Sequence, residues 1–281
     1  MRIQNNIASM NALRNLSVNN KQMSKSMEKL SSGYRINRAA DDAAGLAISE
    51  KMRGQIGGLE MASKNAQDGI SMIQTAEGAL QESHAILQRM RDLSVQAAND
   101  TNTTSDRQQL QKEVDALSSE LSRIANDTEF NTKSLLNGDL ASGSEVTFHI
   151  GANEDQSIDV AISTMTASAL GDTSTGGVTI DSVDIETQTG ANTAISSIDD
   201  ALNQVSTQRA DLGAVQNRLE HTIKNLDTSR ENLQAAESSI RDTNMAKDMS
   251  DLTKNQILQQ AGTAMLAQAN QKSQSVLQLL G

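Results

Sequence analysis

Residues 198–240, IDDALNQVSTQRADLGAVQNRLEHTIKNLDTSRENLQAAESSI, carry the strongest periodic signal in the chain. An aliphatic residue stands at every seventh position of this stretch, namely Ile198, Val205, Leu212, Leu219, Leu226, Leu233 and Ile240. Such a repeat lays one apolar stripe along an α-helix and is typical of coiled-coil packing. The neighbouring row includes Arg209, Arg230 and Glu237, so we expect a narrow seam against helices of the same chain.

A second long helix is expected between the acids Asp41-Asp42 and a polar run at residues 99–104. Its seven-residue row consists of Met52, Leu59, Ala66, Ile73, Leu80 and Leu87. The two acids suit the positive N-terminal end of a helix dipole. After the polar run, the sequence SDRQ at residues 105–108 matches a capping box and predicts that a third helix starts at Ser105.

The middle of the chain has a different pattern. Between residue 137 and about residue 190 the apolar period falls to two, which predicts short, half-buried strands and hairpins. The alternating residues are Val146, Phe148, Ile150, Ile158, Val160, Ile162, Val178 and Ile180. No Lys or Arg occurs from Ser134 to Gln208, whereas acids are frequent there, so we expect this region to stay solvated.

Both ends of the chain are predicted to form helices with thin apolar stripes, and a lone helix of this kind is marginal in water. Ser31-Ser32-Gly33 predicts the end of the first one, because Gly readily adopts the left-handed conformation that terminates helices. The order of a thin helix, a long helix, strands, a long helix and a thin helix suggests a chain folded back on itself. The predicted fold is therefore mainly α, an elongated antiparallel coiled-coil helical rod with a small β-hairpin region in the middle of the chain.

The composition excludes several classes of protein. The 281 residues have a net charge of −11 and contain no Cys, Pro or Trp, so neither disulfides nor a thiol nucleophile are available. Clustered cations and stacking aromatics are missing, which argues against nucleic acid as a partner. The sequence has neither a membrane-spanning apolar run nor the apolar core of a signal peptide. Because His84, His149 and His221 are isolated and no catalytic motif occurs, we expect no enzyme activity, no metal and no cofactor.

Three motifs make a family resemblance visible. SSGYRINRAADDAAGLAI at residues 31–48 resembles the N-terminal signature of bacterial flagellin, and QRMRDLSVQAAN at 88–99 resembles a second motif of that family. The ending at residues 261–281, which contains AMLAQAN and LQLL, resembles a third. The likeness covers essentially the whole chain. It resembles a short flagellin without large outer domains, because only about 50 residues separate its helical arms.

The resemblance implies a structural subunit that polymerises into the extracellular filament of the bacterial flagellum for swimming. It implies that residues 1–42 and 242–281 form an inner coiled-coil layer, and that residues 43–241 form a rod domain with a β-hairpin segment at about 137–190. The implied partners are other copies of the chain, hook-associated and cap proteins and a flagellar export chaperone. Secretion through the flagellar channel, without a cleaved signal peptide, is also implied.

The family further implies recognition by the innate immune receptor Toll-like receptor 5. Matching the motif residue by residue places Arg89, Leu93 and Glu113 in the receptor contact patch, with Gln88 and Arg91 adjacent. A different interpretation is that Leu93 packs inside the rod and Arg89 pairs with an acid. At the end of the chain, Leu277, Leu279 and Leu280 resemble a segment held by the export chaperone and sensed by cytosolic immune receptors.

Two alternatives remain open at this point. A hook–filament junction protein, which belongs to the hook-associated proteins, shares flagellin-like ends but forms only a short ring. A soluble coiled-coil adaptor would explain the seven-residue repeats and would never polymerise. The unbroken signature at residues 31–48 and the short middle favour the filament subunit over both.

Overall fold

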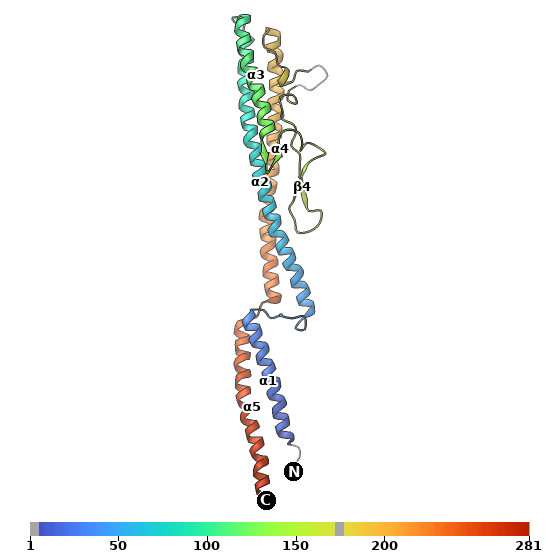
Figure 1. Ribbon diagram of the computed structural model, residues 1–281, viewed down its shortest axis with the longest axis vertical. Coiled ribbons are helices and arrows are strands. Elements are labelled where there is room, and N and C mark those ends of the chain that lie inside the picture. The colour runs from blue at the N-terminus through green and yellow to red at the C-terminus, as the bar shows by residue number, and fades with distance from the viewer. Residues whose placement is uncertain (1–5, 172–176, 281) are drawn as a thin grey trace. The chain divides into compact units, whose positions relative to one another are not determined.

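The computed structural model describes residues 6–171 and 177–280, with side chains up to Gln271, and is mostly helical (Figure 1). Its α-helices are α1 (Ile7–Ser32), α2 (Ala43–Ala97), α3 (Thr104–Asp127), α4 (Gln188–Arg241) and α5 (Met245–Leu280). Between α3 and α4 lie the strands β1 (Glu129–Phe130), β2 (Lys133–Ser134), β3 (Val146–His149) and β4 (Ser157–Val160), followed by the 3₁₀ helix η1 (Ile180–Ser182). The predicted fold class, mainly α with a small β region in the middle of the chain, is confirmed.

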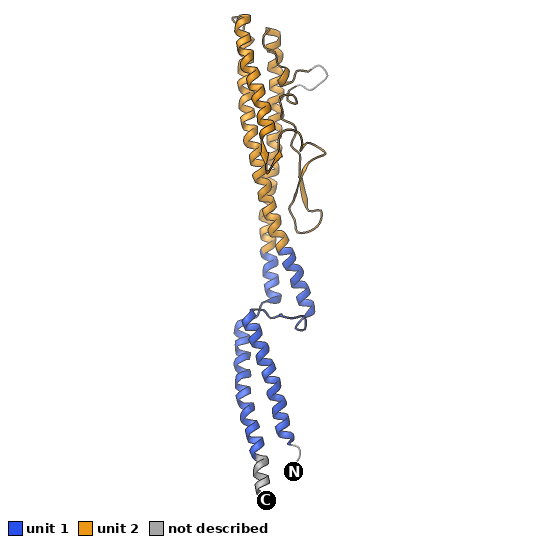
Figure 2. Ribbon diagram, in the orientation of Figure 1, with its two compact units in different colours: residues 1–56, 231–281 blue, residues 57–230 orange. Residues whose placement is uncertain are grey.

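The chain divides into two compact units (Figure 2). Unit 1 comprises residues 1–56 and 231–281, and unit 2 comprises residues 57–230. The division into an inner layer and a rod that the family resemblance implies falls at other residues. It concerns places in a filament rather than compactness, so it stays a prediction.

The core of unit 2 follows the seven-residue rows. Ala66, Ile73, Leu80 and Leu87 of α2 are buried. On α4, Ile198, Val205, Leu212, Leu219 and Leu226 are buried as well. Spacing of this kind keeps one stripe of each helix facing its neighbour, which is the packing that the sequence predicts.

Ion pairs show that α2 runs antiparallel to both α3 and α4 within unit 2. Arg91 pairs with Asp199 near the start of α4 at 2.6 Å, and the earlier residue Glu77 lies 3.7 Å from the later Arg209. On the α3 side, the Arg107 guanidinium donates from Nε to the carbonyl of Ala97 at 2.8 Å, and the earlier residue Arg89 pairs with the later Glu113 at 2.7 Å. Between Glu77 and Ala97, α2 therefore has a neighbouring helix on two sides.

The start of α3 differs from the sequence prediction. The capping residue is Thr103 and not Ser105: its hydroxyl accepts a bond from the Asp106 N–H, and the Asp106 carboxylate accepts one from the Thr103 N–H at 3.0 Å. A capping box needs a short hydroxyl at the cap and an acceptor three residues later. Thr103 and Asp106 supply both, and Asp106 also places a negative charge in the first turn.

The strands form two antiparallel hairpins. In the larger one Val146 pairs with Val160 and Phe148 with Ile158, which confirms the alternation predicted for these segments. The smaller hairpin, β1–β2, turns through Asn131 and Thr132, both with positive φ. The strand predicted around Val178 and Ile180 is wrong: Ile180 begins η1, because the Ser182 hydroxyl accepts the Thr179 N–H at 3.1 Å and closes a tight turn.

Two glycines on α2 allow the β3–β4 hairpin to pack closely on the helix surface. A methyl carbon placed on Gly69 would lie 3.1 Å from Cδ1 of the Phe148 ring, and one on Gly58 would lie 2.9 Å from the methyl of Ala152. Between them, Asn65 donates from its side-chain amide to the carbonyl of His149 at 3.0 Å. Gly58, Asn65 and Gly69 fall close to one face of the helix, so this face carries the hairpin.

In unit 1, α1 and α5 pack as an antiparallel pair. The Thr243 N–H donates to the carbonyl of Gly33 at one end, and the Ser9 hydroxyl donates to the side-chain amide oxygen of Asn270 at the other. α1 ends where the sequence predicts, because Gly33 has φ of 76° and its N–H donates to the Lys29 carbonyl at 2.8 Å.

No helix in the described ranges combines the length and apolar character needed to cross a membrane.

Candidate functional site

The α1–α5 pair leaves many of its large apolar side chains on the surface, while Leu16, Met23, Leu30, Leu252 and Leu266 are half-buried. Ten large apolar side chains are exposed, namely Ile7, Met10, Leu13, Val18 and Met27 on α1 and Met245, Met249, Ile257, Leu258 and Met265 on α5. Among the described side chains of the two helices, the buried residues are Ser26 and Asn255, both polar. In unit 2 the comparably exposed large apolar residues are Met61 and Val95. We call the ten residues the terminal apolar surface.

The distribution of these residues around each helix explains why one partner cannot cover them. Ile7 and Val18 are eleven residues apart, close to three full turns, so they share one side of α1. The residues of α1 that bond to α5, such as Ser9, lie elsewhere on the helix. On α5, Leu258 and Met265 share one side and Met249 lies on another. Two helices can bury only one face against each other, so the remaining faces stay in water.

Unit 1 also contains a network built from the residue 31–48 motif. Asp41 accepts an ion pair from Lys25 at 2.6 Å, and this bond lowers the pKa of the Asp41 carboxyl below its ordinary value. Asp42 caps α2 by accepting the Gly45 N–H at 2.9 Å, as the sequence predicts for an acid at that position. Gly45 has no room for a side chain, since a methyl carbon there would lie 2.8 Å from Cδ1 of the buried Ile36.

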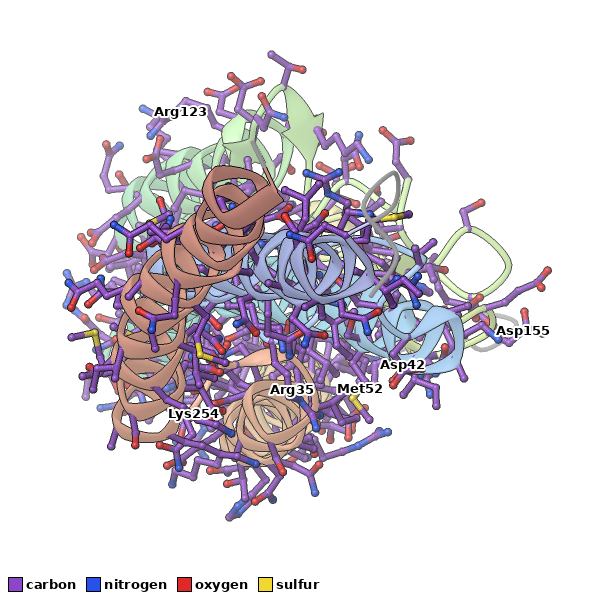
Figure 3. The ribbon with its side chains drawn as sticks, turned by 90° about the horizontal axis from the view of Figure 1, so that it is seen from below. Arg35, Asp42, Met52, Arg123, Asp155 and Lys254 are labelled. Atoms are coloured by element: carbon purple, nitrogen blue, oxygen red, sulfur yellow. The ribbon has the colours of Figure 1, made fainter. Side chains whose placement is uncertain are left out.

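The same motif joins the α1–α2 connection to the end of α4. Arg35 donates from its backbone N–H to the carbonyl of Arg241 at 2.7 Å, and its guanidinium lies against the end of α4 (Figure 3). The Arg241 guanidinium stacks on the Tyr34 ring, 4.8 Å from the centroid, and pairs with Glu50. Its hydrogen bond lowers the pKa of the Glu50 carboxyl. We call Tyr34, Arg35, Glu50 and Arg241 the clasp.

The structure brings three of the predicted receptor-contact residues together. Arg89 on α2 donates from Nε and Nη2 to the Glu113 carboxylate on α3, at 2.9 and 2.7 Å, and both side chains are exposed. Gln88 is exposed beside them, with its amide nitrogen 3.0 Å from Nε2 of His84. An exposed pair of this kind contributes little to stability and remains accessible to a partner.

The other two predicted contact residues lie elsewhere. Arg91 points to α4, where its hydrogen bond with Asp199 raises the pKa of the guanidinium. Leu93 is only 1% exposed and belongs to the hydrophobic core of unit 2. Val95, two residues on, is 49% exposed, and the sequence analysis missed it. The seven-residue row that contains the buried residues Leu87 and Ser94 could have predicted its exposure, because Val95 lies just outside that row.

For the predicted C-terminal recognition segment, the structure describes the backbone only. Leu277, Leu279 and Leu280 belong to the backbone of α5, but their side chains lie outside the described residues. The expectation that the acidic middle of the chain stays solvated holds only in part. Asp155, at the turn of the β3–β4 hairpin, lies at the periphery (Figure 3), but the apolar side chains of this region pack into the core of unit 2, where Leu135, Leu136, Ile162, Leu170 and Ile185 are fully buried.

Long antiparallel helices, together with terminal helices whose apolar faces are open, define a class of protein: a structural subunit that is completed by other molecules. Models of the bacterial flagellin N-terminal and C-terminal helical regions match residues 3–141 and 195–280. The chain belongs to the flagellin family. It is a structural subunit of the bacterial flagellar filament, an extracellular assembly used for motility.

Relatives that match over their full length support this assignment. The chain is similar to a flagellin of Bacillus subtilis, 57% identical, and to a flagellin of Halalkalibacterium halodurans, 54% identical, in each case over 100% of both chains. A solved structure of a flagellar hook associated protein from Legionella pneumophila is 15% identical with a TM-score of 0.54, and the match covers 68% of this chain and 98% of that one. At that identity the likeness shows a shared fold alone.

Proposed function

We propose that the terminal apolar surface is the face through which copies of this chain contact one another in the inner layer of the filament, formed by residues 1–42 and 242–281. The observation that carries this proposal is the concentration of exposed large apolar side chains on α1 and α5, in a pair whose buried positions are polar. Exposed apolar area of this extent is stabilised when a protein surface covers it. Residues 43–241 then form the outer rod domain.

Open helical assembly follows from heterologous contacts. A surface that meets a different surface of the next copy does not close into a ring unless the rotation closes, and it otherwise generates a filament. The two helices present apolar residues on several sides, which suits contacts with more than one neighbour. A junction protein, which forms a short ring, shares the fold, but the full-length identity to flagellins favours the filament subunit.

Seeded assembly tests this function. Purified full chain is mixed with short filament seeds and examined by negative-stain electron microscopy, beside a variant lacking residues 1–42 and 242–281. Long uniform filaments from the full chain alone are the expected result. A matched variant, Ile7→Ser with Val18→Ser, keeps the α5-facing side of α1 intact and is expected to raise the monomer concentration at which filaments stop growing. Filaments of normal length from the truncated chain would refute the proposal.

We further propose that the exposed Arg89–Glu113 pair and Gln88 form a contact patch for Toll-like receptor 5. The support is their common exposure on two adjacent helices. There the Arg89 guanidinium and the Glu113 carboxylate can each form an ion pair with a group of the receptor in place of the pair that they form with each other. Arg91 is adjacent in sequence but engaged with Asp199. The buried position of Leu93 means that, in the folded monomer, this leucine supports the patch from beneath instead of presenting itself.

A receptor-signalling assay separates these roles. Arg89→Ala is expected to reduce signalling more than about tenfold with an unchanged unfolding transition, since an exposed pair contributes little to the fold. Leu93→Ala is expected to destabilise unit 2 by about 2–5 kcal/mol, because it opens a cavity in the core. An unchanged dose response for the well-folded Arg89→Ala variant would exclude the patch.

The remaining partners are also proposals. We expect an export chaperone to hold the C-terminal segment with Leu277, Leu279 and Leu280 before secretion through the flagellar channel. Cap and hook-associated proteins are expected to contact the chain at the ends of the filament. A chain ending at Ser275 should lose chaperone affinity while units 1 and 2 remain folded, and equal affinity for both chains would contradict the first of these proposals.

A further inference from the structure

Half of the terminal apolar surface is methionine. Met10 and Met27 on α1, and Met245, Met249 and Met265 on α5, are between 47 and 67% exposed. In unit 2, Met61 is 55% exposed, whereas Met72, Met90 and Met165 are at most 5% exposed. Apart from Met61, the methionines exposed to this extent thus lie on the helices that the proposed function assigns to subunit contacts.

Methionine sulfur is chemically reactive in a way that other aliphatic side chains are not. Hydrogen peroxide transfers one oxygen atom to the thioether: an S–O bond forms, the O–O bond breaks and water leaves. The sulfur loses two electrons and the peroxide gains them. The product, methionine sulfoxide, is polar and chiral, and reductases return it to the thioether. The chain contains no cysteine that would react first.

We propose that these five methionines are an oxidation site that controls self-assembly. The inference rests on the proposed function of the terminal apolar surface. Peroxide acting on the unassembled chain turns five of its ten exposed apolar side chains into polar ones, so the face no longer gains from being covered. The other five residues of this surface, Ile7, Leu13, Val18, Ile257 and Leu258, supply only half of its large apolar side chains and cannot make up for the lost apolar area. In an assembled filament the same five sulfur atoms are shielded from peroxide.

The test uses the full chain. Monomer is treated with dilute hydrogen peroxide, catalase removes the excess, and mass spectrometry of peptides measures sulfoxide at each methionine. Seeded assembly is then followed by sedimentation. Full oxidation of the five sites is expected to raise the critical concentration for assembly more than about tenfold. The same peroxide dose applied to preformed filaments is expected to oxidise these five at least about ten times more slowly.

Two variants make the result specific. Replacing all five methionines by leucine keeps the face apolar and should make assembly resistant to peroxide, whereas Met61→Leu, at an exposed site of unit 2, should leave the sensitivity unchanged. Equal sensitivity in the five-leucine variant would overturn the proposal.

If that variant does not assemble, a second experiment uses the oxidised natural chain, which is reduced by methionine sulfoxide reductase. Restored assembly supports the proposal, and a failure to assemble after the sulfoxide has been removed overturns it. Untreated natural chain that fails to assemble would instead refute the proposed function, and the inference with it.

Discussion

Replacing Gly69 by alanine tests how the β3–β4 hairpin is held on α2. Glycine inside a helix costs about 0.8–1 kcal/mol relative to alanine, so an unobstructed replacement stabilises by about that amount. At Gly69 the new methyl would lie 3.1, 3.2 and 3.3 Å from three atoms of the Phe148 ring. Ordinary carbon contacts are about 3.5–4.0 Å, so the ring has to retreat by several tenths of an ångström.

The expected magnitude follows from these two opposing effects. Overpacking a fitted contact costs about 1–3 kcal/mol, which exceeds or cancels the gain in helix propensity. Gly69→Ala should therefore change the free energy of unfolding of unit 2 by between about zero and a loss of about 2 kcal/mol. Gly78→Ala is the matched control, since it lies in the same helix and unit and its methyl would meet nothing within 4 Å. It should stabilise by about 0.8–1 kcal/mol.

Urea unfolding followed by circular dichroism measures both variants in the same transition, and amide hydrogen exchange reports on β3 and β4. Exchange in the hairpin should accelerate for Gly69→Ala and stay unchanged for Gly78→Ala. Adding Phe148→Ala should remove the penalty of Gly69→Ala, giving a favourable coupling between the two sites. Equal stabilisation by both glycine replacements would refute the proposed packing of Phe148 on Gly69.

Other perturbations address the cap, the network of unit 1 and a surface ion pair. Thr103→Ala should destabilise α3 by about 1 kcal/mol, whereas Ser105→Ala should have little effect; a larger loss at Ser105, measured by urea unfolding, would restore the capping box predicted from the sequence. Asp41 has a folded-state pKa below its ordinary 3.8, so its stabilising contribution is present above that pH and lost as the pH falls through the lowered value. Asp41→Asn should therefore flatten the acid dependence of unit 1 stability, and an unchanged acid transition would show that its pairing with Lys25 is unimportant. A double-mutant cycle on Arg91 and Asp199 should give a coupling below about 1 kcal/mol, because both side chains are more than 40% exposed.

The long helices could be predicted because their signal is repeated. Each seven-residue step in α2 and α4 adds an independent instance of the same apolar stripe, and the buried residues from Ala66 to Leu87 follow it. The family motifs were equally readable, since an eighteen-residue match has few accidental occurrences. Gly33 was found as a helix end because a single residue type suits the left-handed conformation there.

The errors arose where local alternatives have nearly equal energy. Thr103 and Ser105 both carry hydroxyls, and the choice between them depends on which one has an acceptor aligned three residues later. Ile180 alternates like a strand residue, but within the described ranges it belongs to no paired strand. Its N–H donates to the Leu170 carbonyl at 3.0 Å beside an isolated bridge between Gly171 and Thr179, and the chain then enters the 3₁₀ helix η1. Leu93 is buried because α2 is flanked by α3 and α4 at the same level, and a single-helix pattern does not reveal a second neighbour.

The clasp has an optical consequence. Tyr34 is the only tyrosine of the chain, and there is no tryptophan. Ultraviolet emission from the chain therefore originates almost entirely at the place where the ring stacks on Arg241. A stacked, charged neighbour and bulk water give a phenol different emission lifetimes and different anisotropy. The chain thus carries a native fluorophore at the connection between its terminal and long helices, so movements of that connection can be followed in unlabelled protein as it enters a filament.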